Sequence, residues 1–350
     1  MLTQTKNMVK YIIKRILLMI PITFAILIVS FTLSTFMSQN SLLNQLEGLV
    51  SPELVEAERI RMGYYDPWHV KVAKYFINFF SGDWGTSYVV ADGVPVTTLI
   101  ASIFPKTIEL VILPVILIPI LSVKLGVSSA KNRNNWKDTI VRGFMMLGVC
   151  IPVFWLATLL QYFFGTALLY FTYGALNIEV MNPNSVTMSY HPITGFRLID
   201  AILMNDQVLL QDTILHLAIP SFCLIAVSLA GITRLTRASM LEVMEKDYIR
   251  TARAKGVPNK EVINKHSLRN ALIPTSTAIV GTTALLLTGS LYVETAFNYN
   301  GMGYYMVQAI IRGDYVVING ILVFSSIIIL VGTLISDVLY TIIDPRIVYT

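Results

Sequence analysis

One uninterrupted apolar run near the start of the chain limits what this sequence can fold into. Ile16–Phe36 holds 21 residues without a charged side chain. At 1.5 Å per residue, a helix of that length crosses a hydrocarbon layer of about 30 Å. The run is longer than the apolar core of a cleaved signal peptide, and no A-x-A cleavage pattern follows it. The sequence therefore predicts a retained transmembrane helix.

The composition extends this prediction to the whole chain. Charged residues make up 13% of the 350 residues, against about 25% in soluble domains, and hydrophobic residues make up 55%. A soluble chain cannot bury so much apolar surface, which excludes a soluble enzyme, a disordered chain and a nucleic-acid-binding domain as the main interpretation. Cys150 and Cys223 lie in apolar runs, so neither a disulfide framework nor a cysteine metal site is expected.

Five further apolar segments predict an all-α polytopic membrane protein with six transmembrane helices. Their approximate limits are Thr107–Ser129, Ile140–Tyr162, Thr213–Thr233, Ala271–Val293 and Val316–Ile343, and the third span extends to Phe171 in its longest version.

The distribution of basic residues orients these spans. Nineteen Lys and Arg residues fall on the side of the two termini and seven on the other side. Loops rich in Lys and Arg stay in the cytoplasm. We therefore expect both termini to be cytoplasmic, and the net charge of +5 to serve orientation rather than nucleic-acid binding.

The first outside segment, residues 37–106, contains aromatic and aliphatic residues at helical spacing from Trp68 to Phe80. Because Lys71 and Lys74 lie between them, the pattern predicts an amphipathic helix on the membrane surface or packed on the spans. Gly82-Asp83-Trp84-Gly85 then predicts a turn.

The chain divides accordingly into three parts. Residues 1–94 hold the first span and the amphipathic segment, 95–343 form the transmembrane core with a cytoplasmic loop over 234–270, and 344–350 form a cytoplasmic tail. The second outside segment, 172–212, is polar and expected to be irregular.

The most informative part of the core is the predicted cytoplasmic loop. Arg234–Pro274 carries nine basic and four acidic residues among scattered apolar ones. Arg234–Lys255 is rich in helix-forming residues and is expected to be helical throughout. Gly256 suits the left-handed conformation that ends a helix, and Pro258 suits the first turn of the next. The loop is therefore predicted to be two helices joined by a sharp bend.

The apolar residues of this bent pair indicate a docking element. Tyr248, Ile249 and Ala252 share one face of the first helix, and Val262 and Ile263 form an apolar edge on the second. A rigid, partly apolar helix pair suits insertion into a groove on another protein. The alternative on physical grounds is a solvated basic loop that only fixes topology.

The loop also keeps the spacing of a known motif. It reads Arg-Thr-Ala-Arg-Ala-Lys-Gly over residues 250–256, followed nine residues later by His-Ser-Leu-Arg over 266–269. This resembles the EAA loop of binding-protein-dependent ABC importer permeases, in the form seen in the B-type subunit of dipeptide, oligopeptide and nickel permeases. Seven further stretches of this chain also resemble that subunit. They are Gly82-Asp83-Trp84-Gly85, Ile151-Pro152-Val153-Phe154-Trp155, Gly289-Ser290, Glu294-Thr295, Gly301-Met302-Gly303, Arg312-Gly313-Asp314-Tyr315 and Asp344-Pro345-Arg346.

The resemblance implies a type I ABC importer permease fold in a bacterial or archaeal cytoplasmic membrane, forming half of a pathway for dipeptides or oligopeptides. It implies a homologous second permease, two ATP-binding subunits and an external solute-binding protein as partners. The chain itself would be no enzyme and would bind no cofactor, because ATP and Mg²⁺ belong to the partner subunits. Nickel, metallophore or haem cargo is the alternative within this class.

The resemblance assigns ATPase coupling to one set of loop residues. They are Tyr248, Ile249, Arg250, Thr251, Ala252, Arg253, Ala254, Lys255, Gly256, His266, Leu268 and Arg269.

Two carboxylates within or near spans, Glu109 and Asp337, are candidates for the pathway or for a subunit contact, because ionised carboxylates avoid lipid. The alternative is that each lies at a membrane interface. The four histidines have no ligand spacing, and no Gly-x-x-x-x-Gly-Lys-Ser/Thr phosphate loop occurs, so we expect neither a metal site nor an ATP site.

Two other classes of membrane protein fit the sequence less well. An ion-coupled secondary transporter needs buried charges or broken helices near the midplane, and the predicted spans show few of either. An intramembrane enzyme needs paired polar catalytic groups in the spans, and the sequence offers none.

Overall fold

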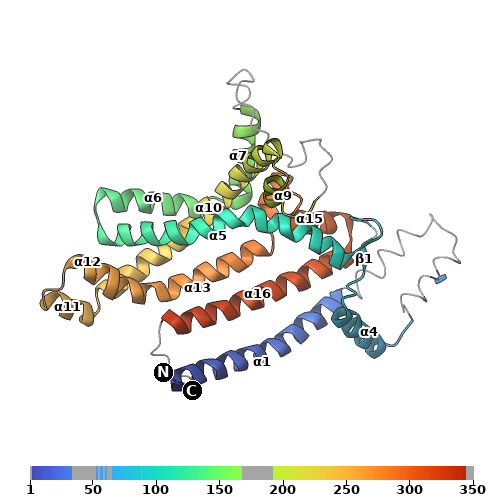
Figure 1. The fold of residues 1–350 in the computed structure, drawn as a ribbon, viewed down its shortest axis with the longest axis horizontal. Helices are drawn as coiled ribbons and strands as arrows, with labels where there is room; N and C mark the ends of the chain where they lie inside the picture. Colours follow the sequence, from blue (N-terminus) through green and yellow to red (C-terminus); the bar gives the residue numbers. More distant parts are fainter. Residues whose placement is uncertain are drawn as a thin grey trace.

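The computed structural model describes residues 2–33, 65–87, 89–167 and 192–343, together with four single positions between 53 and 60. The described chain is almost entirely helical, and its long helices run beside one another (Figure 1). Residues 168–171 of the extension of the third span, residues 172–191 of the second outside segment and the tail lie outside the described residues.

The elements keep the order of the chain. The helices are α1 (Leu2–Leu33), α4 (Trp68–Ser81), α5 (Val96–Lys131), α6 (Trp136–Cys150), α7 (Val153–Tyr162), α9 (Arg197–Leu203), α10 (Gln207–Met244), α11 (Asp247–Ala254), α12 (Asn259–Glu261), α13 (Leu268–Leu287), α14 (Leu291–Ala296), α15 (Met302–Arg312) and α16 (Tyr315–Ile343), with π-helical turns η2 (Phe163–Ala167) and η3 (Val262–Ser267). The strands β1 (Thr86–Ser87) and β2 (Val94–Pro95) form one antiparallel pair.

Five stretches of helix in the described chain are long and apolar enough to cross a membrane. They are Ile13–Thr32, Val96–Lys131, Gln207–Met244, Asn259–Ala296 and Tyr315–Val338. These correspond to the predicted first, second, fourth, fifth and sixth spans. The second begins at Val96, so its first turns belong to a region that the sequence assigned to the outside segment.

The predicted third span, Ile140–Tyr162, is not one continuous helix. The chain there forms α6 and α7, and the two helices are bent by 98°. Pro152 has no backbone N–H and disfavours the helical conformation in the residue before it. Ile151 is accordingly extended, with φ −81° and ψ 119°, and ends α6. Counting the bent pair as one span brings the number of spans to six.

The predicted fifth span is interrupted as well. Helix α13 ends at Leu287 and α14 begins at Leu291. Gly289 between them has a φ of +101°, and a Cβ placed on it would lie 2.5 Å from the backbone nitrogen of Gly303. Only glycine fits this close approach of two backbones.

The main core lies where α5 and α10 pack along each other and against α7 and the α14 region. A second core joins the start of α5 to α15 and α16. Helix α1 lies at the side of this bundle and packs against α16 and α4. Helix α4, predicted from its amphipathic pattern, stacks Phe76 on Phe24 of α1 with the ring centres 5.2 Å apart.

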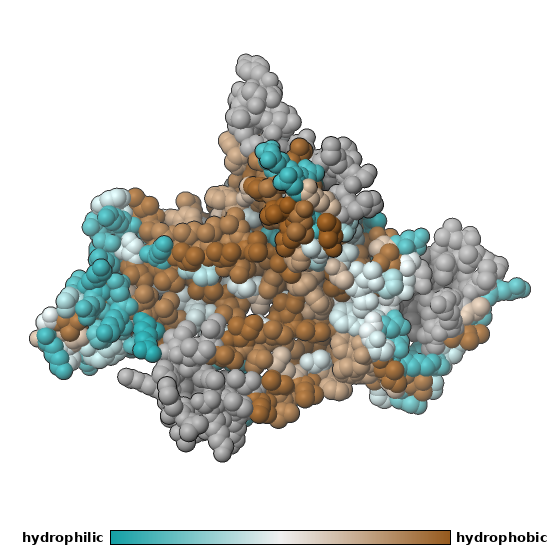
Figure 2. All heavy atoms as spheres, viewed as in Figure 1, coloured by the Kyte–Doolittle hydropathy of each residue, from teal (hydrophilic) through white to brown (hydrophobic). Residues whose placement is uncertain are grey.

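The two ends of the bundle differ in character. Helices α11 and α12 form one end, which we call the loop end, and α4 and β1 lie at the opposite end (Figure 1). Figure 2 shows hydrophobic side chains in the broad middle of the molecule and hydrophilic ones gathered over the loop end. The start of α1 and the end of α16 lie on the side of the loop end.

Candidate functional site

The loop end is built on an extension of α10. This helix continues past the predicted span to Met244, where the chain leaves the helix at Glu245 and Lys246. Lys246 is extended, with φ −70° and ψ 150°, and α11 starts at Asp247. The predicted uninterrupted helix over Arg234–Lys255 is therefore wrong. The break turns α11 back so that Ile249 is fully buried, and burial of an apolar face outweighs helix propensity.

The apolar residues of the loop hold it together from within. Helix α11 contacts η3, and Ile249 and Val262 have no exposed surface at all. Ile263 joins Ala130, Met240 and Ala271 in a small core at the base of the loop. The predicted apolar docking face is thus corrected, because Ile249, Val262 and Ile263 are used within the chain.

The predicted bend at Gly256 is confirmed. Its φ is +76°, and its N–H donates to the carbonyl of Arg253 at 3.0 Å while Val257 donates to Ala252 at 3.2 Å. These bonds satisfy carbonyls that the end of α11 leaves open. Pro258 precedes the first turn of α12 as its capping position rather than lying inside the turn.

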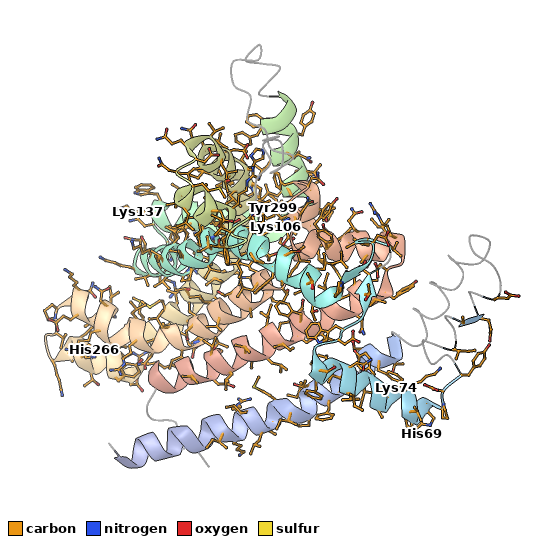
Figure 3. The ribbon with its side chains drawn as sticks, turned by 45° about the vertical axis from the view of Figure 1, so that its right-hand side comes forward. His69, Lys74, Lys106, Lys137, His266 and Tyr299 are labelled. Atoms are coloured by element: carbon orange, nitrogen blue, oxygen red, sulfur yellow. The ribbon has the colours of Figure 1, made fainter. Side chains whose placement is uncertain are left out.

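Most of the remaining candidate residues are accessible, and we call the exposed ones the loop surface. Tyr248, Arg250, Thr251, Arg253, Ala254, Lys255, Gly256 and Arg269 are exposed, whereas Ala252, His266 and Leu268 are half-buried. Figure 3 shows His266 at the loop end, far from His69 and Lys74 on α4. The surface is basic, since Arg250, Arg253, Lys255 and Arg269 lie on it.

Local hydrogen bonds restrain this surface. The Asn270 side-chain amide donates to the Tyr248 hydroxyl at 2.8 Å and joins α13 to α11. The Thr251 hydroxyl donates to the Asp247 carbonyl at 3.0 Å. The loop therefore presents charged and polar groups on a fixed backbone.

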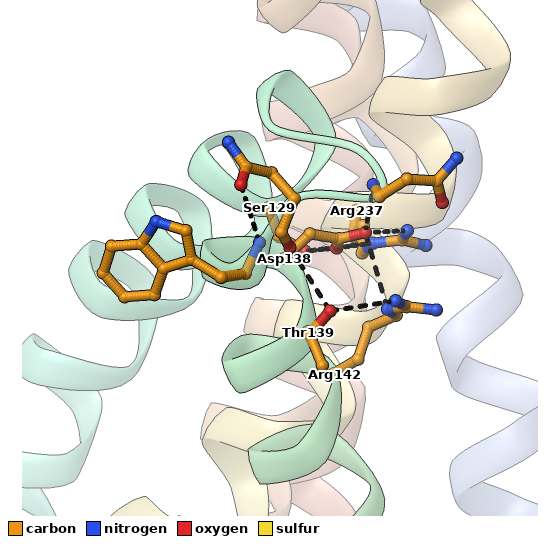
Figure 4. A network of polar contacts seen from close by, with 8 residues as sticks. Ser129, Asp138, Thr139, Arg142 and Arg237 are labelled. Carbon is orange, nitrogen blue, oxygen red and sulfur yellow. Dashed lines mark hydrogen bonds and ion pairs between the residues drawn. The ribbon is translucent and has the colours of Figure 1, made fainter.

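A buried polar network supports the loop from below (Figure 4). Asp138, at the start of α6, is fully buried and accepts hydrogen bonds from Arg237 of α10. The Ser129 hydroxyl at the end of α5 also donates to this carboxylate. Sequence reasoning missed the network. The available signal was an acidic residue two positions before a predicted span, among flanks that are otherwise basic.

The two carboxylate candidates lie in different surroundings. Glu109 is buried in α5 and accepts the backbone N–H of Leu198, in the first turn of α9, at 2.6 Å. Asp337 of α16 forms an ion pair with Arg15 of α1 at 3.0 Å. Both therefore join helices of this chain, and neither is brought to the loop.

Two further buried acids at the opposite end were given no role by sequence reasoning. Glu294 is fully buried, and its carboxylate accepts the backbone N–H groups of Ser290, Gly303 and Tyr304. Asp314 accepts the Ser87 hydroxyl at 2.6 Å and so joins α16 to β1. Sequence-adjacent glycines, as in Gly301-Met302-Gly303, were the available sign of tight packing there.

Within the described ranges, no three His, Cys, Asp or Glu side chains gather as a metal site would require. The loop end combines a fixed bend, an exposed face rich in Lys and Arg, and a small buried apolar core beneath it.

Comparison with known proteins identifies the family. Residues 122–349, which contain the loop and its buried support, match the binding-protein-dependent transport system inner membrane component family. The oligopeptide transport system permease protein AppB of Bacillus subtilis is 35% identical over 98% of this chain and all of that protein. The dipeptide transport system permease protein DppB of Alkalihalophilus pseudofirmus is 36% identical over the same shares. The chain belongs to the family of binding-protein-dependent transport system inner membrane components, as a multi-pass protein of the cytoplasmic membrane.

Proposed function

We propose that this chain is one of two membrane subunits of an ATP-driven importer for short peptides. An external binding protein delivers the peptide, and the loop over residues 234–270 receives the motion of two cytoplasmic ATPases. The names of the relatives support peptides as cargo, since they are described as oligopeptide and dipeptide permeases.

The observation that carries the coupling role is the form of the loop. Its apolar residues Ile249, Val262 and Ile263 are buried against the rest of the chain, and its basic face is exposed on a restrained backbone. A loop that only fixed topology would need its charges but not a buried Ile249, a left-handed Gly256 and a hydrogen-bonded Tyr248. A rigid exposed element suits the transmission of force to the helices on which it stands.

These helices suggest the path of the motion. The loop joins α10 directly to α13, and α10 packs along α5. Closure of the ATPases on ATP would displace the loop and tilt these helices together, switching the pathway between two packed arrangements. The peptide would then pass between this chain and the second permease.

The proposal is tested by where ATP hydrolysis resides. The purified chain alone should hydrolyse no ATP, because it lacks a phosphate-binding loop. Adding the ATPase subunits and the second permease should restore hydrolysis, and the peptide-loaded binding protein should stimulate it. Turnover by the isolated chain, with contaminating ATPases excluded, would contradict the proposal, as would ATP-independent uptake driven by an ion gradient.

The cargo is tested separately. Mass spectrometry of the ligand that co-purifies with the cognate binding protein should find dipeptides or oligopeptides. Nickel, a metallophore or haem in that position would overturn the peptide assignment and leave the importer class intact.

A further inference from the structure

The buried network beneath the loop connects the turn between α5 and α6 to a residue of α10 that lies 99 positions after Asp138. Ser129 closes α5, Asp138 opens α6 and Arg237 lies in the extension of α10 toward the loop. Arg237 is thus two turns before α10 ends, between the membrane-spanning part of this helix and the coupling surface.

The Asp138 carboxylate is held on both of its oxygens (Figure 4). Arg237 Nε lies 2.8 Å from Oδ1 and Nη2 lies 3.0 Å from Oδ2, a two-pronged contact. The Ser129 hydroxyl donates to Oδ1, and the Asn134 backbone N–H donates to Oδ2 at 3.0 Å. Arg142 completes the set with an ion pair at 3.4 Å.

This arrangement exceeds what the start of α6 requires. The Asn135 side chain already accepts the N–H of Trp136 and caps the helix. A planar guanidinium that grips both carboxylate oxygens fixes relative rotation as well as distance. The contact therefore restrains how α10 can turn relative to α5 and α6.

Close packing on the adjoining turn strengthens the restraint. A Cβ placed on Gly126 of α5 would lie 2.6 Å from Thr236 Cβ, so the two helices approach closely one residue before Arg237. Ala130 and Met240 continue this contact toward the base of the loop. Near the loop, α10 is therefore held to α6 by the Asp138–Arg237 contact and to α5 by close packing.

We propose that Asp138 and Arg237 form a coupling clamp, which makes the loop, α10 and the α5–α6 turn move as one body. Without it, a push on the loop bends or rotates the extension of α10 and does not reach α5 and α6. The clamp rests on the proposed importer function, in which the loop is the point of force. Asp138 and Arg237 are positioning residues in this role, since neither needs to touch ATP or the peptide.

The test measures peptides imported per ATP hydrolysed, in proteoliposomes containing the complete importer, with dialanine and trialanine as probes. Arg237→Lys keeps the charge but grips only one point, and Asp138→Asn keeps the shape but removes the charge. Both should retain the ATPase subunits and hydrolyse ATP, with a several-fold lower import per ATP. Asp138→Asn combined with Arg237→Gln, a neutral pair able to hydrogen bond, should recover part of the ratio lost in Asp138→Asn.

Arg133→Ala is the matched control. Arg133 pairs with Glu245 at 3.1 Å between the same α5–α6 turn and the end of α10, but both side chains are exposed. Exposed pairs contribute little, so this variant should keep the wild-type ratio.

Two results would overturn the clamp. One is an unchanged import-to-ATP ratio in Arg237→Lys and Asp138→Asn. The other is a smaller amount of folded protein whose import-to-ATP ratio equals that of the wild type, which would make the network only structural. If Asp138→Asn fails to fold, the ratio measured for Arg237→Lys decides. A wild-type complex that imports neither probe would instead count against the proposed peptide function.

Discussion

Buried acidic side chains determine several of the turns of this molecule at the residue scale. Asp138, Asp200, Glu294 and Asp314 are all buried, and each accepts backbone N–H groups at a point where the chain changes direction. A buried carboxylate is costly unless donors surround it, so each of these acids is bound to one local geometry. They act as fixed joints between helices.

Gly256 provides the clearest prediction at this scale. Gly256→Val places a branched side chain at φ +76°, where the left-handed conformation costs about 1–2 kcal/mol or more. No neighbour lies within 4 Å of the added Cβ, so the expected cost is that of the backbone conformation. We expect normal membrane insertion, weaker retention of the ATPase subunits on detergent purification, and lower uptake.

Gly82→Val is its control. Gly82 also has a positive φ, +84°, and also has open space around its Cβ, but it lies at the opposite end. The two variants should lose similar stability, and only Gly256→Val should release the ATPases. Equal ATPase retention in both would count against the loop as the docking element.

Glu294 leads to a stability prediction. Glu294→Ala removes the acceptor for one buried N–H group, that of Gly303, and for two part-buried ones, and a buried N–H left unpaired costs about 1–3 kcal/mol. The melting temperature of the purified protein should fall strongly. The melting temperature of Glu294→Gln, which keeps one carbonyl oxygen, should fall less. The melting temperature of Glu245→Ala, which removes an exposed carboxylate, should not change.

The residues of the loop show what sequence reasoning can reach. The bend at Gly256 was predictable, because a glycine followed two residues later by a proline between helical stretches is typical of a helix end and a new helix start. The burial of Ile249 within its own chain was not predictable. An apolar face has the same sequence pattern whether it packs on its own chain or on another, and only the break at Glu245–Lys246 decides between them. Asp138 and Arg237 lie 99 positions apart, and nothing local in the sequence pairs them.

Long apolar helices are the elements that sequence predicts best, because bilayer thickness sets their length. Interruptions within them are harder to place. Pro105, Pro114 and Pro119 all lie inside α5, whereas Pro152 breaks the third span. Neighbouring helices and small local adjustments can satisfy the backbone groups freed by a proline. The outcome depends on the surrounding packing, which one sequence does not reveal.

Helix α1 provides a prediction at the element scale. Its contact with α16 includes the ion pair of Arg15 and Asp337, whose side chains are 41% and 19% exposed. Arg15→Gln should destabilise the protein by an amount between the ~1 kcal/mol of an exposed pair and the ~3 kcal/mol of a buried one. Thermal unfolding in detergent measures this.

A double-variant cycle decides whether the pair itself is responsible. Arg15→Gln combined with Asp337→Asn removes both charges, and if the two side chains stabilise each other, the double variant should lose less stability than the sum of the two single variants. If the two single losses simply add, the ion pair contributes nothing to holding α1.

At the scale of the whole molecule, the loop end and the opposite end are built by different means. The loop end has a basic exposed surface over a small apolar core. The opposite end is closed by acid-centred turns at Glu294 and Asp314 and by the short hairpin. The proposed importer subunit, which would receive force at one end and open at the other, would need such a division, and α5 and α10 run between the two ends.

The orientation of the two ends in the membrane is the last prediction. The excess of Lys and Arg on the loop side, nineteen against seven, predicts that the loop end faces the cytoplasm and that α4 faces outward. Single cysteines at Asn259 and His69, both exposed, would be introduced into a chain carrying Cys150→Ala and Cys223→Ala. In intact cells an impermeant thiol reagent should label the cysteine at position 69 and leave the one at 259 unlabelled until the membrane is opened. Labelling of position 259 from outside would show that the loop end faces outward. The loop could then not reach an ATPase in the cytoplasm.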